Sequence, residues 1–293
     1  MLWLPAMVPA LAWSATGTDS LAATADRIRP LFLRKKPPQP GDWLTQHDEP
    51  GQSYAQFRAT TGQRAIDRYD TLRVVLVGSL TRGQVEVFRA VTDYLTPFFG
   101  LNVVIDPHQP TESLPASAWR PAGGTGHRQL HTMWLLEKLL RSRRRARDAA
   151  VLGLTAFDLW PGPGWNFVFG QASLSERVGV WSMARNGEAD GAAALRRVCA
   201  LRTAMTATHE VGHMFGIRHC IAYECGMNGS NHVGERDRAP LEFCPECQPK
   251  LWWTLHLDPT RRSRALAAVA RRNGHGRVAR DFERQLATLE ASS

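Results

Sequence analysis

Long hydrophobic runs are almost absent from this chain of 293 residues. Beyond the first 13 residues, no segment approaches the 18 or so apolar residues that a membrane-spanning helix requires, so we expect no membrane partner. The opening segment, residues 1–18, carries no charge and therefore lacks the basic start of a secretory signal. We predict an uncleaved extension and a cytoplasmic protein, while an early cleavage site at Ala10-Leu11-Ala12 stays open as the alternative.

Acidic side chains are also in deficit, because 27 Asp and Glu face 36 Lys and Arg, which gives a net charge of +9. Such a balance favours acidic partners or a nucleic-acid surface. Much of the excess lies in residues 141–147 and after Thr260, and no recognised nucleic-acid-reading motif accompanies it. We interpret these basic runs as solvated segments and do not expect nucleic acid to be the main partner.

Histidine, by contrast, is concentrated in one stretch, "HEVGHMFGIRHC", His209 to Cys220. His209 and His213 are four residues apart, so on a helix their imidazoles lie on the same side. His219 would lie on a distant face of an unbroken helix, because each residue turns the chain by about 100°. Gly216 allows the helix to end, since glycine adopts the left-handed conformation without steric penalty. The spacing therefore predicts three imidazole ligands around one metal ion.

Three protein ligands and one open position are typical of catalytic zinc, which lowers the pKa of its bound water to about 7. Glu210 follows the first ligand, and we expect its carboxylate to act as the general base that takes the water's proton. A pair of helical histidines alone is usually packing or surface. The full HExxHxxGxxH pattern favours the zinc interpretation.

The five cysteines fall into two kinds. Four lie within residues 220–247 as two short-spaced pairs, and this arrangement predicts a closed, tetrahedral structural zinc site with the ligands Cys220, Cys225, Cys244 and Cys247. Two local disulfides remain the alternative if the protein is exported. Cys199 lies in an apolar helical pattern and is interpreted as a small buried hydrophobe.

The sequence after His219 resembles a known family. Cys220, the Cys225-Gly226-Met227 triplet and the Cys244-Pro-Glu-Cys247 pair follow the histidine motif, and "GDWLTQHDEPGQSYAQF" (residues 41–57) and "MNGSNH" (residues 227–232) extend the likeness. Together they resemble the archaemetzincins, zinc metallopeptidases of the metzincin clan, including the eukaryotic-type members. The resemblance covers most of residues 40–255.

The resemblance implies a role for each matching residue. His209, His213 and His219 would bind the catalytic zinc, and Glu210 would be the general base. Met227 would form the Met-turn beneath the metal. The second, structural zinc would be bound by Cys220, Cys225, Cys244 and Cys247, which makes two Zn²⁺ ions in all.

Alternating strand and helix patterns predict an α/β fold. The chain is 43% hydrophobic, and the predicted strands lie at residues 72–78, 101–107 and 149–160, with helices at 83–100 and 128–147 between them. This order predicts a twisted, mostly parallel sheet with right-handed crossovers. A long helix from about Ala192 to Met214 would then carry the first two histidines. The C-terminal helical pattern is interrupted near Pro259.

A short apolar run, residues 166–173, predicts an antiparallel edge strand. In metzincin-like enzymes such an edge lies over the cleft and pairs with an extended peptide. We therefore predict substrate contacts for Phe167, Val168, Phe169, Gly170, Gln171 and Ala172. An edge strand without a binding role remains the alternative.

We expect three parts: an N-terminal extension and wrapping segment (1–65), an upper catalytic subdomain (66–219), and a C-terminal subdomain with the Met-turn and cysteine site (220–293). His232 is predicted to face either substrate or solvent. Trp252 and Trp253 are expected in the core, and the histidines without ligand spacing are interpreted as structural or exposed: His47, His108, His127, His131, His256 and His275.

These features together predict a monomeric zinc metallopeptidase that acts on peptides or proteins. Whether cleavage is internal or aminopeptidase-like stays open. The alternative function is a zinc-bearing, weakly active or inactive module that recognises an acidic partner or nucleic acid through its basic surface. The presence of Glu210 favours the enzyme, because three imidazoles alone would satisfy a binding role.

Overall fold

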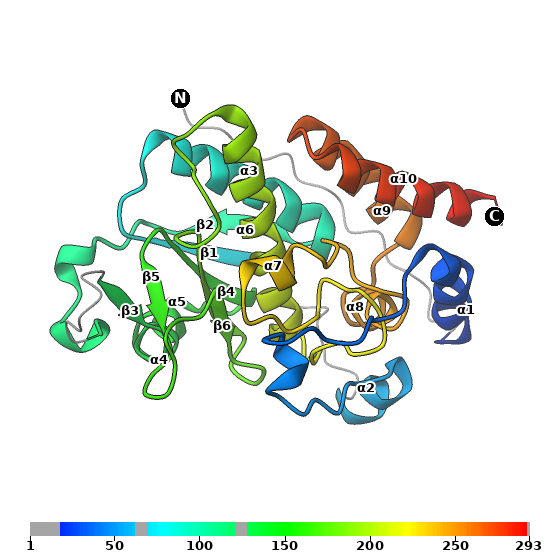
Figure 1. The fold of residues 1–293 in the computed structure, drawn as a ribbon, viewed down its shortest axis with the longest axis horizontal. Helices are drawn as coiled ribbons and strands as arrows, with labels where there is room; N and C mark the ends of the chain where they lie inside the picture. The colour runs from blue at the N-terminus through cyan, green and yellow to red at the C-terminus, as the bar shows by residue number, and fades with distance from the viewer. Residues whose placement is uncertain (1–17, 62–68, 121–127, 292–293) are drawn as a thin grey trace.

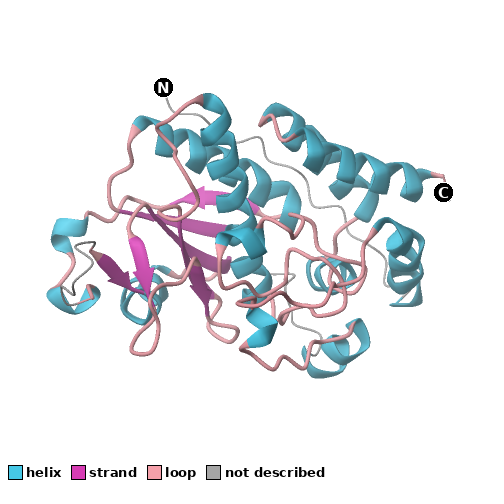
Figure 2. Ribbon diagram, viewed as in Figure 1, coloured by secondary structure: helices cyan, strands magenta, loops and turns pink. Residues whose placement is uncertain are grey.

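A mixed five-stranded sheet forms one half of the molecule (Figures 1 and 2). The computed structural model describes residues 18–61, 69–120 and 128–291. The strand order is β2-β1-β4-β7-β6, and only the last pair is antiparallel. The strands are β1 (Thr71–Val77), β2 (Asn102–Ile105), β4 (Asp148–Thr155), β7 (Val178–Ser182) and β6 (Gly170–Ala172). The prediction of a mostly parallel sheet with an antiparallel edge strand is confirmed.

Both faces of this sheet are covered by helices. Along β1, Val74 packs in the larger core cluster with α3 (Arg82–Phe99) and α6 (Ala193–Met214). The next residue, Val75, points to the opposite face and packs with the apolar side chains of Leu135–Leu140. Alternation along a strand explains this division, because successive side chains point to opposite faces. The sheet therefore provides α6 with a rigid apolar support.

Two sequence predictions on this side of the molecule are wrong in detail. The predicted helix at residues 128–147 begins later, because Gln129–His131 forms strand β3 and pairs with β5 (Asp158–Trp160). The predicted strand 149–160 is consequently divided between β4 and β5. The physical reason is a long-range pairing: the Gln129 amide donates a 2.8 Å hydrogen bond to Asp158, and helical periodicity carries no information about such a partner.

The segment after β3 is helical throughout. It comprises α4 (Thr132–Trp134), the π-helical turn η5 (Leu135–Leu140) and α5 (Arg141–Arg143). The first long helix, α3, agrees with the predicted helix at residues 83–100 to within one residue at each end. Pro97 lies inside its last turn, and the helix ends at Gly100, whose φ of 65° is left-handed. Gly100 rather than Pro97 therefore terminates α3.

The N-terminal segment packs beside the C-terminal helices, as Figure 1 shows. Helices α1 (Thr18–Ile28) and α2 (Tyr54–Thr61) contact α8 (Gln248–Leu255), and α1 also contacts α10 (Gly276–Glu290). Between α1 and α2 the chain is mostly irregular. The proposed domain boundaries at residues 65 and 219 stay a prediction. The remaining helices and turns are α7 (Val233–Arg236), α9 (Pro259–Arg272), η1 (Arg29–Leu31), η2 (Trp43–Thr45), η3 (Thr111–Ser113) and η4 (Ala116–Ala118).

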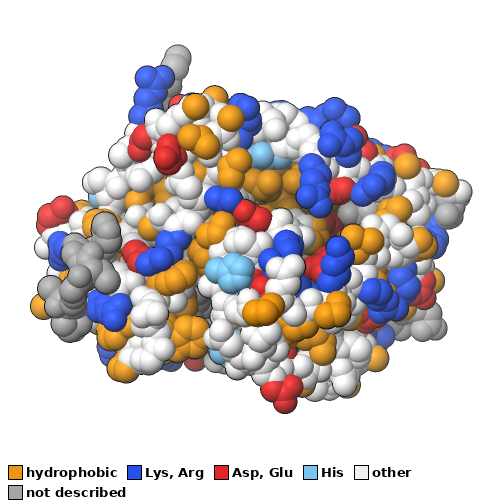
Figure 3. Space-filling model, in the orientation of Figure 1, with side chains coloured by type: hydrophobic (Ala, Val, Ile, Leu, Met, Phe, Trp, Pro, Cys, Tyr) orange, Lys and Arg blue, Asp and Glu red, His pale blue; other side chains and the backbone are white. Residues whose placement is uncertain are grey.

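On the face shown in Figure 3, Lys and Arg side chains alternate with neutral and acidic groups, and several lie on the side of α9 and α10. Within the described parts of the chain, no helix is both long and apolar enough to cross a membrane. Cys199 is fully buried, as predicted. Trp252 is also in the core and is 1% exposed.

A buried histidine joins three helices. His275, at the start of α10, is 7% exposed; its Nδ1 lies 2.7 Å from the Tyr94 hydroxyl of α3, and its Nε2 lies 3.0 Å from the Arg197 carbonyl of α6. Since a carbonyl only accepts, Nε2 donates and Nδ1 accepts from Tyr94 in the neutral ring. Burial lowers the pKa of His275 below its ordinary value.

This lowered pKa makes stability depend on pH. The unfolded chain binds a proton near pH 6.5, whereas folded His275 binds it only at lower pH, so its contribution is complete above about pH 6.5 and is lost as pH falls. We predict that His275→Gln flattens the decrease in unfolding free energy between pH 7.5 and 5, measured by urea denaturation. His108→Gln, at an exposed histidine, is the control and should keep the wild-type slope. Equal slopes for His275→Gln and wild type would contradict the assignment.

Candidate metal centre and active site

Helix α6 and the turn that follows it place three imidazoles together. His209 and His213 lie one turn apart on the last part of α6. Beyond Phe215, the Gly216 N–H donates to the His213 carbonyl (2.8 Å) and the Ile217 N–H donates to the Gly212 carbonyl (3.1 Å). This is the Schellman pattern, and the φ of 84° at Gly216 is the left-handed conformation that it requires.

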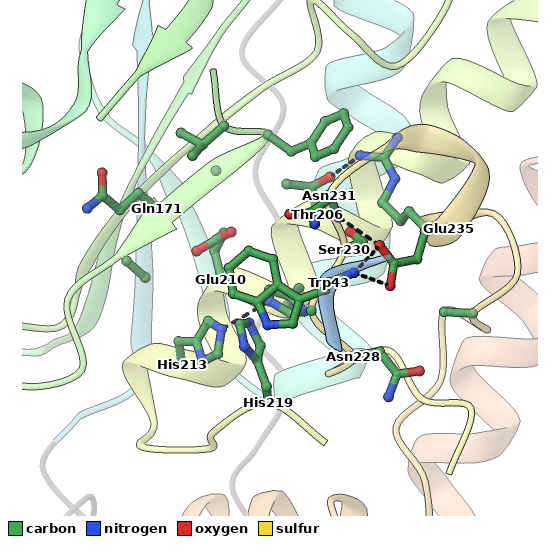
Figure 4. Close-up of a pocket in the computed structure, with 18 of the residues that line it drawn as sticks. Trp43, Gln171, Thr206, Glu210, His213, His219, Asn228, Ser230, Asn231 and Glu235 are labelled. Atoms are coloured by element: carbon green, nitrogen blue, oxygen red, sulfur yellow. Dashed lines mark hydrogen bonds between the residues drawn. The ribbon is translucent and has the colours of Figure 1, made fainter. Parts of the chain in front are cut away.

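The turn brings His219 back to the helix. One ring nitrogen of each of His209, His213 and His219 lies within 4.8 Å of the others. Figure 4 shows His213 and His219 side by side, with Glu210 on the same side of the cavity. The sequence-based expectation that Gly216 redirects the chain therefore agrees with the local geometry.

The tautomers of the two helical histidines leave their lone pairs pointing at each other. His209 Nδ1 lies 2.9 Å from the Gly226 carbonyl and His213 Nδ1 lies 2.7 Å from the Ile217 carbonyl, so both Nδ1 atoms donate. Burial holds the pKa of His209 well below its usual range and lowers that of His213 to about 4. Both rings are thus neutral, and their unprotonated Nε2 atoms lie only 3.0 Å apart. A cation between them removes this repulsion, so the donor set fits a metal ion.

The third histidine is oriented by the N-terminal segment, which sequence reasoning did not assign to the site. His219 Nδ1 donates to Glu49 Oε1 over 2.7 Å, and the indole of Trp43 donates to the same oxygen over 3.0 Å. Burial raises the pKa of Glu49, but these hydrogen bonds outweigh it and the net pKa is lowered. A carboxylate behind an imidazole fixes the ring's orientation and leaves Nε2 available for a metal. The stretch "HDEP" alone offered no signal of this long-range contact.

Glu210 lies beneath the edge strand. It is 6% exposed, and burial raises its pKa to about 8. A Cβ atom added at Gly170 of β6 would lie 2.6 Å from a Glu210 carboxylate oxygen, so only glycine lets the strand pass this close. A cavity of about 690 Å³ opens above Glu210 and the three histidines. Its lining includes all six predicted substrate-contact residues, Phe167, Val168, Phe169, Gly170, Gln171 and Ala172.

Only part of that segment forms the edge strand. Residues Gly170–Ala172 pair with β7, while Val168 makes an isolated antiparallel bridge to Leu159. The predicted strand over residues 166–173 is therefore too long. The bridge to β5 pulls the chain away from β7, and this long-range pairing could not be read from the apolar pattern.

A second cluster of donors lies beside the first. The thiols of Cys220, Cys225, Cys244 and Cys247 are all buried and lie within 4.8 Å of one another. None forms a disulfide, and the 3.5 Å between Cys220 Sγ and Cys244 Sγ is close to the separation of two thiolates on one tetrahedral zinc, about 3.8 Å. Contacts with the neighbouring thiols hold the pKa of Cys220 well below its usual range. These donors fit a structural metal ion.

The backbone links the two clusters. The Cys220 N–H donates to the Met227 carbonyl over 2.8 Å, and the Met227 N–H lies 3.4 Å from Cys225 Sγ. Met227 in turn packs beneath α6, where a Cβ at Gly212 would lie 2.5 Å from its sulfur. The cysteine cluster therefore holds the turn on which the histidine helix rests.

A third group of donors joins the cavity wall to the N-terminal segment. The carboxylate of Glu235 accepts the backbone N–H groups of Trp43 (3.0 Å) and Asn231 (2.8 Å). Asp42 is bound by Arg238 at 2.6 Å and by His232 at 3.3 Å. His232 thus caps α7 and pairs with a carboxylate instead of facing substrate. Because its acids already have partners, this group ties the segment down and carries no metal-site assignment.

Comparisons with known proteins agree with this geometry. The model of Peptidase family M54 matches residues 132–252. Archaemetzincin-2 of Homo sapiens is 33% identical over an alignment of 279 residues. The match covers 85% of this chain and 76% of that protein. The archaemetzincin of Thermococcus kodakarensis is 37% identical over half of this chain, and 77% of its own length is covered. The crystal structure of archaemetzincin from Methanopyrus kandleri gives a TM-score of 0.53 at 29% identity, over 65% of this chain and 97% of that one.

The fold and the histidine site are accordingly those of a metallopeptidase. The chain belongs to the archaemetzincin family. Membership of a peptidase family implies peptide or protein substrates.

Removal of the Glu49 carboxylate tests its role behind His219. We predict that Glu49→Ala lowers the affinity of the histidine site for zinc by about 10- to 100-fold, because the imidazole loses its orienting acceptor. The affinity is measured by competition with a chelator of known zinc affinity. Glu112→Ala, at an exposed carboxylate, is the control. An unchanged zinc affinity in Glu49→Ala would rule out the positioning role.

The link between the clusters predicts a coupled loss of metal. In Cys244→Ser we expect the catalytic zinc as well as the structural zinc to fall below full occupancy, because the backbone of Cys220 and Met227 is no longer clamped. Metal content per protein is measured by mass spectrometry or atomic absorption. The control is Cys199→Ser, at the buried cysteine outside the cluster. Loss of a single zinc per chain in Cys244→Ser would show that the sites are independent.

Proposed function

We propose that this protein is a zinc-dependent peptidase in which His209, His213 and His219 bind the catalytic zinc and Glu210 is the general base. The observation that carries the proposal is the convergence of these four side chains on one cavity beneath a sheet edge. Three imidazoles can hold a zinc ion, which would supply the Lewis acid, and the adjacent carboxylate supplies the proton acceptor that peptide hydrolysis requires.

The metal ion and Glu210 would have different roles in the reaction. When bound, zinc supplies a Lewis acid that polarises the carbonyl of the peptide bond. Glu210 accepts a proton from the attacking water and later delivers it to the leaving amine. Burial raises the pKa of Glu210 to about 8, so this carboxylate holds a proton more readily than an exposed one. The carboxylate stays in place because Gly170 leaves room for it.

We propose that the substrate backbone lies along β6. This strand is last in the sheet order, so its outer edge has no strand partner among the described residues. An extended peptide can add to such an edge through main-chain hydrogen bonds. Phe167, Val168, Phe169, Gly170, Gln171 and Ala172 would then contact it, since all six line the cavity.

Five further assignments complete the proposal. Cys220, Cys225, Cys244 and Cys247 bind a second, structural zinc, and Met227 forms the turn beneath the first. Reduced, clustered thiols favour a cytoplasmic location. The protein acts as a monomer. Its parts are the N-terminal segment to residue 65, the catalytic subdomain to residue 219 and the C-terminal subdomain.

The base is tested by Glu210→Gln, which keeps the shape of the side chain and removes its basicity. We predict that kcat for a peptide substrate falls by about 10²- to 10⁴-fold while zinc content stays at the wild-type level. Cleavage is followed by mass spectrometry on a peptide library, and Glu188→Gln, at an exposed site, is the control. Undiminished zinc-dependent cleavage by Glu210→Gln would exclude this residue as the base. Failure of the wild type to cleave any peptide would reject the peptidase function.

A further inference from the structure

One lysine of the core lies against the cysteine cluster. Lys250 is in the first turn of α8 and is 1% exposed. Its ammonium nitrogen, Nζ, donates to the Gln52 carbonyl, to Gln52 Oε1 (3.3 Å) and to Cys247 Sγ (3.9 Å). Among the described residues, none of its hydrogen-bond partners is a carboxylate. A lysine is rarely buried so completely unless its charge is compensated, because removal of an ammonium group from water is unfavourable.

The opposite charge can come only from the sulfur side of this contact. The two oxygens of Gln52 are neutral, so they satisfy hydrogen bonds but compensate no charge. A bound zinc ion holds its cysteine ligands as thiolates, and four thiolates around one Zn²⁺ leave a net negative charge. Cys247 precedes Lys250 by three residues at the start of α8, a spacing that brings two side chains together. The metal-bound cluster therefore fits the buried ammonium as its counter-ion.

The other hydrogen bonds to the cluster are uncharged. Cys225 Sγ accepts the backbone N–H of Met227 over 3.4 Å and that of Cys244 over 3.2 Å. In the part of the chain that the structure describes, no second charged side chain donates to a sulfur of the cluster. Lys250 is thus the side chain that brings positive charge to these thiols.

The same ammonium group reaches the histidine site through one intermediate residue. Gln52 Oε1, which accepts from Lys250, also accepts the backbone N–H of Arg218 over 3.2 Å. Gln52 Nε2 donates to the Gly216 carbonyl over 3.4 Å. Gly216 and Arg218 belong to the turn that returns the chain to His219. Lys250 therefore joins α8, the N-terminal segment and this turn at one point.

We propose that Lys250 is a positioning residue for both metal sites: its charge stabilises the anionic, metal-bound cysteine cluster, and its hydrogen bonds to Gln52 hold the turn before His219. The inference rests on the two proposed zinc sites. It adds a requirement for a buried positive charge that the four thiols by themselves do not express.

Cobalt(II) is the probe for the charge requirement, because thiolate-bound cobalt absorbs through sulfur-to-metal charge transfer and imidazole-bound cobalt does not. The full chain is loaded with Co²⁺ and titrated with a chelator of known Co²⁺ affinity, so this absorption reports the cysteine site alone. We expect Lys250→Gln, which keeps hydrogen-bonding groups without the charge, to lower the Co²⁺ affinity of the site by about 10- to 100-fold. Lys250→Arg, which keeps the charge, should recover most of this loss.

Lys138→Gln is the matched control, because it removes an exposed lysine from η5 and should keep the wild-type affinity. Wild-type affinity in Lys250→Gln would overturn the charge role, and so would equal losses in Lys250→Gln and Lys250→Arg. Absence of the charge-transfer absorption in cobalt-loaded wild type has a different meaning. It would reject the proposed structural metal site itself, and the role of Lys250 would be rejected with it.

Gln52→Ala tests the link to the histidine site separately. This change removes Oε1 and Nε2 but leaves the Gln52 carbonyl and the ammonium group in place. We expect the cysteine site to keep its Co²⁺ affinity and the histidine site to bind Co²⁺ more weakly. Occupancy of the histidine site is the total cobalt per chain, from atomic absorption, minus the cobalt seen by charge transfer. Gln46→Ala, at an exposed glutamine of the same segment, is the control. An unchanged histidine site in Gln52→Ala would overturn this link.

Discussion

Three imidazoles held with one nitrogen each toward a common point are the constraint on which this structure depends. Each imidazole is fixed through its other nitrogen, because Nδ1 of His209 and His213 donates to a carbonyl and that of His219 donates to Glu49. These acceptors come from three separate parts of the chain. A ring with one committed nitrogen has a single orientation that satisfies its hydrogen bond, and this orientation directs the other nitrogen toward the position of a metal ion.

The rest of the fold brings these acceptors to the helix. The cysteine cluster sets the turn that carries Gly226 and Met227, and a buried ion pair between Arg262 of α9 and Glu242 (3.1 Å) holds the adjoining loop. The Gly226 N–H in turn donates to the Glu242 carbonyl. Glycine is required where α6 meets these elements, because a side chain at Gly170 or Gly212 would displace its neighbour. Close packing, more than any single bond, therefore defines the cavity.

Much of this architecture could be predicted, because it is encoded in local patterns. The β1 and β4 strands read as apolar runs, α6 has the expected bounds, and Gly216 adopts the left-handed conformation at the predicted helix end. The errors share one cause. The strand at Gln129–His131 and the short β6 depend on pairing with β5 and β7, which lie elsewhere in the sequence. Periodicity over a few residues describes a face to be buried but not the partner that buries it.

The amino-acid sequence by itself determined the donor set: three imidazoles, one acid and four thiols at spacings that local geometry can close around a metal. It also determined the family, because those residues form a contiguous pattern. Only the tertiary structure decided that Glu49 orients the third imidazole. This role arises from a contact across 170 residues of chain and leaves no local trace in the sequence.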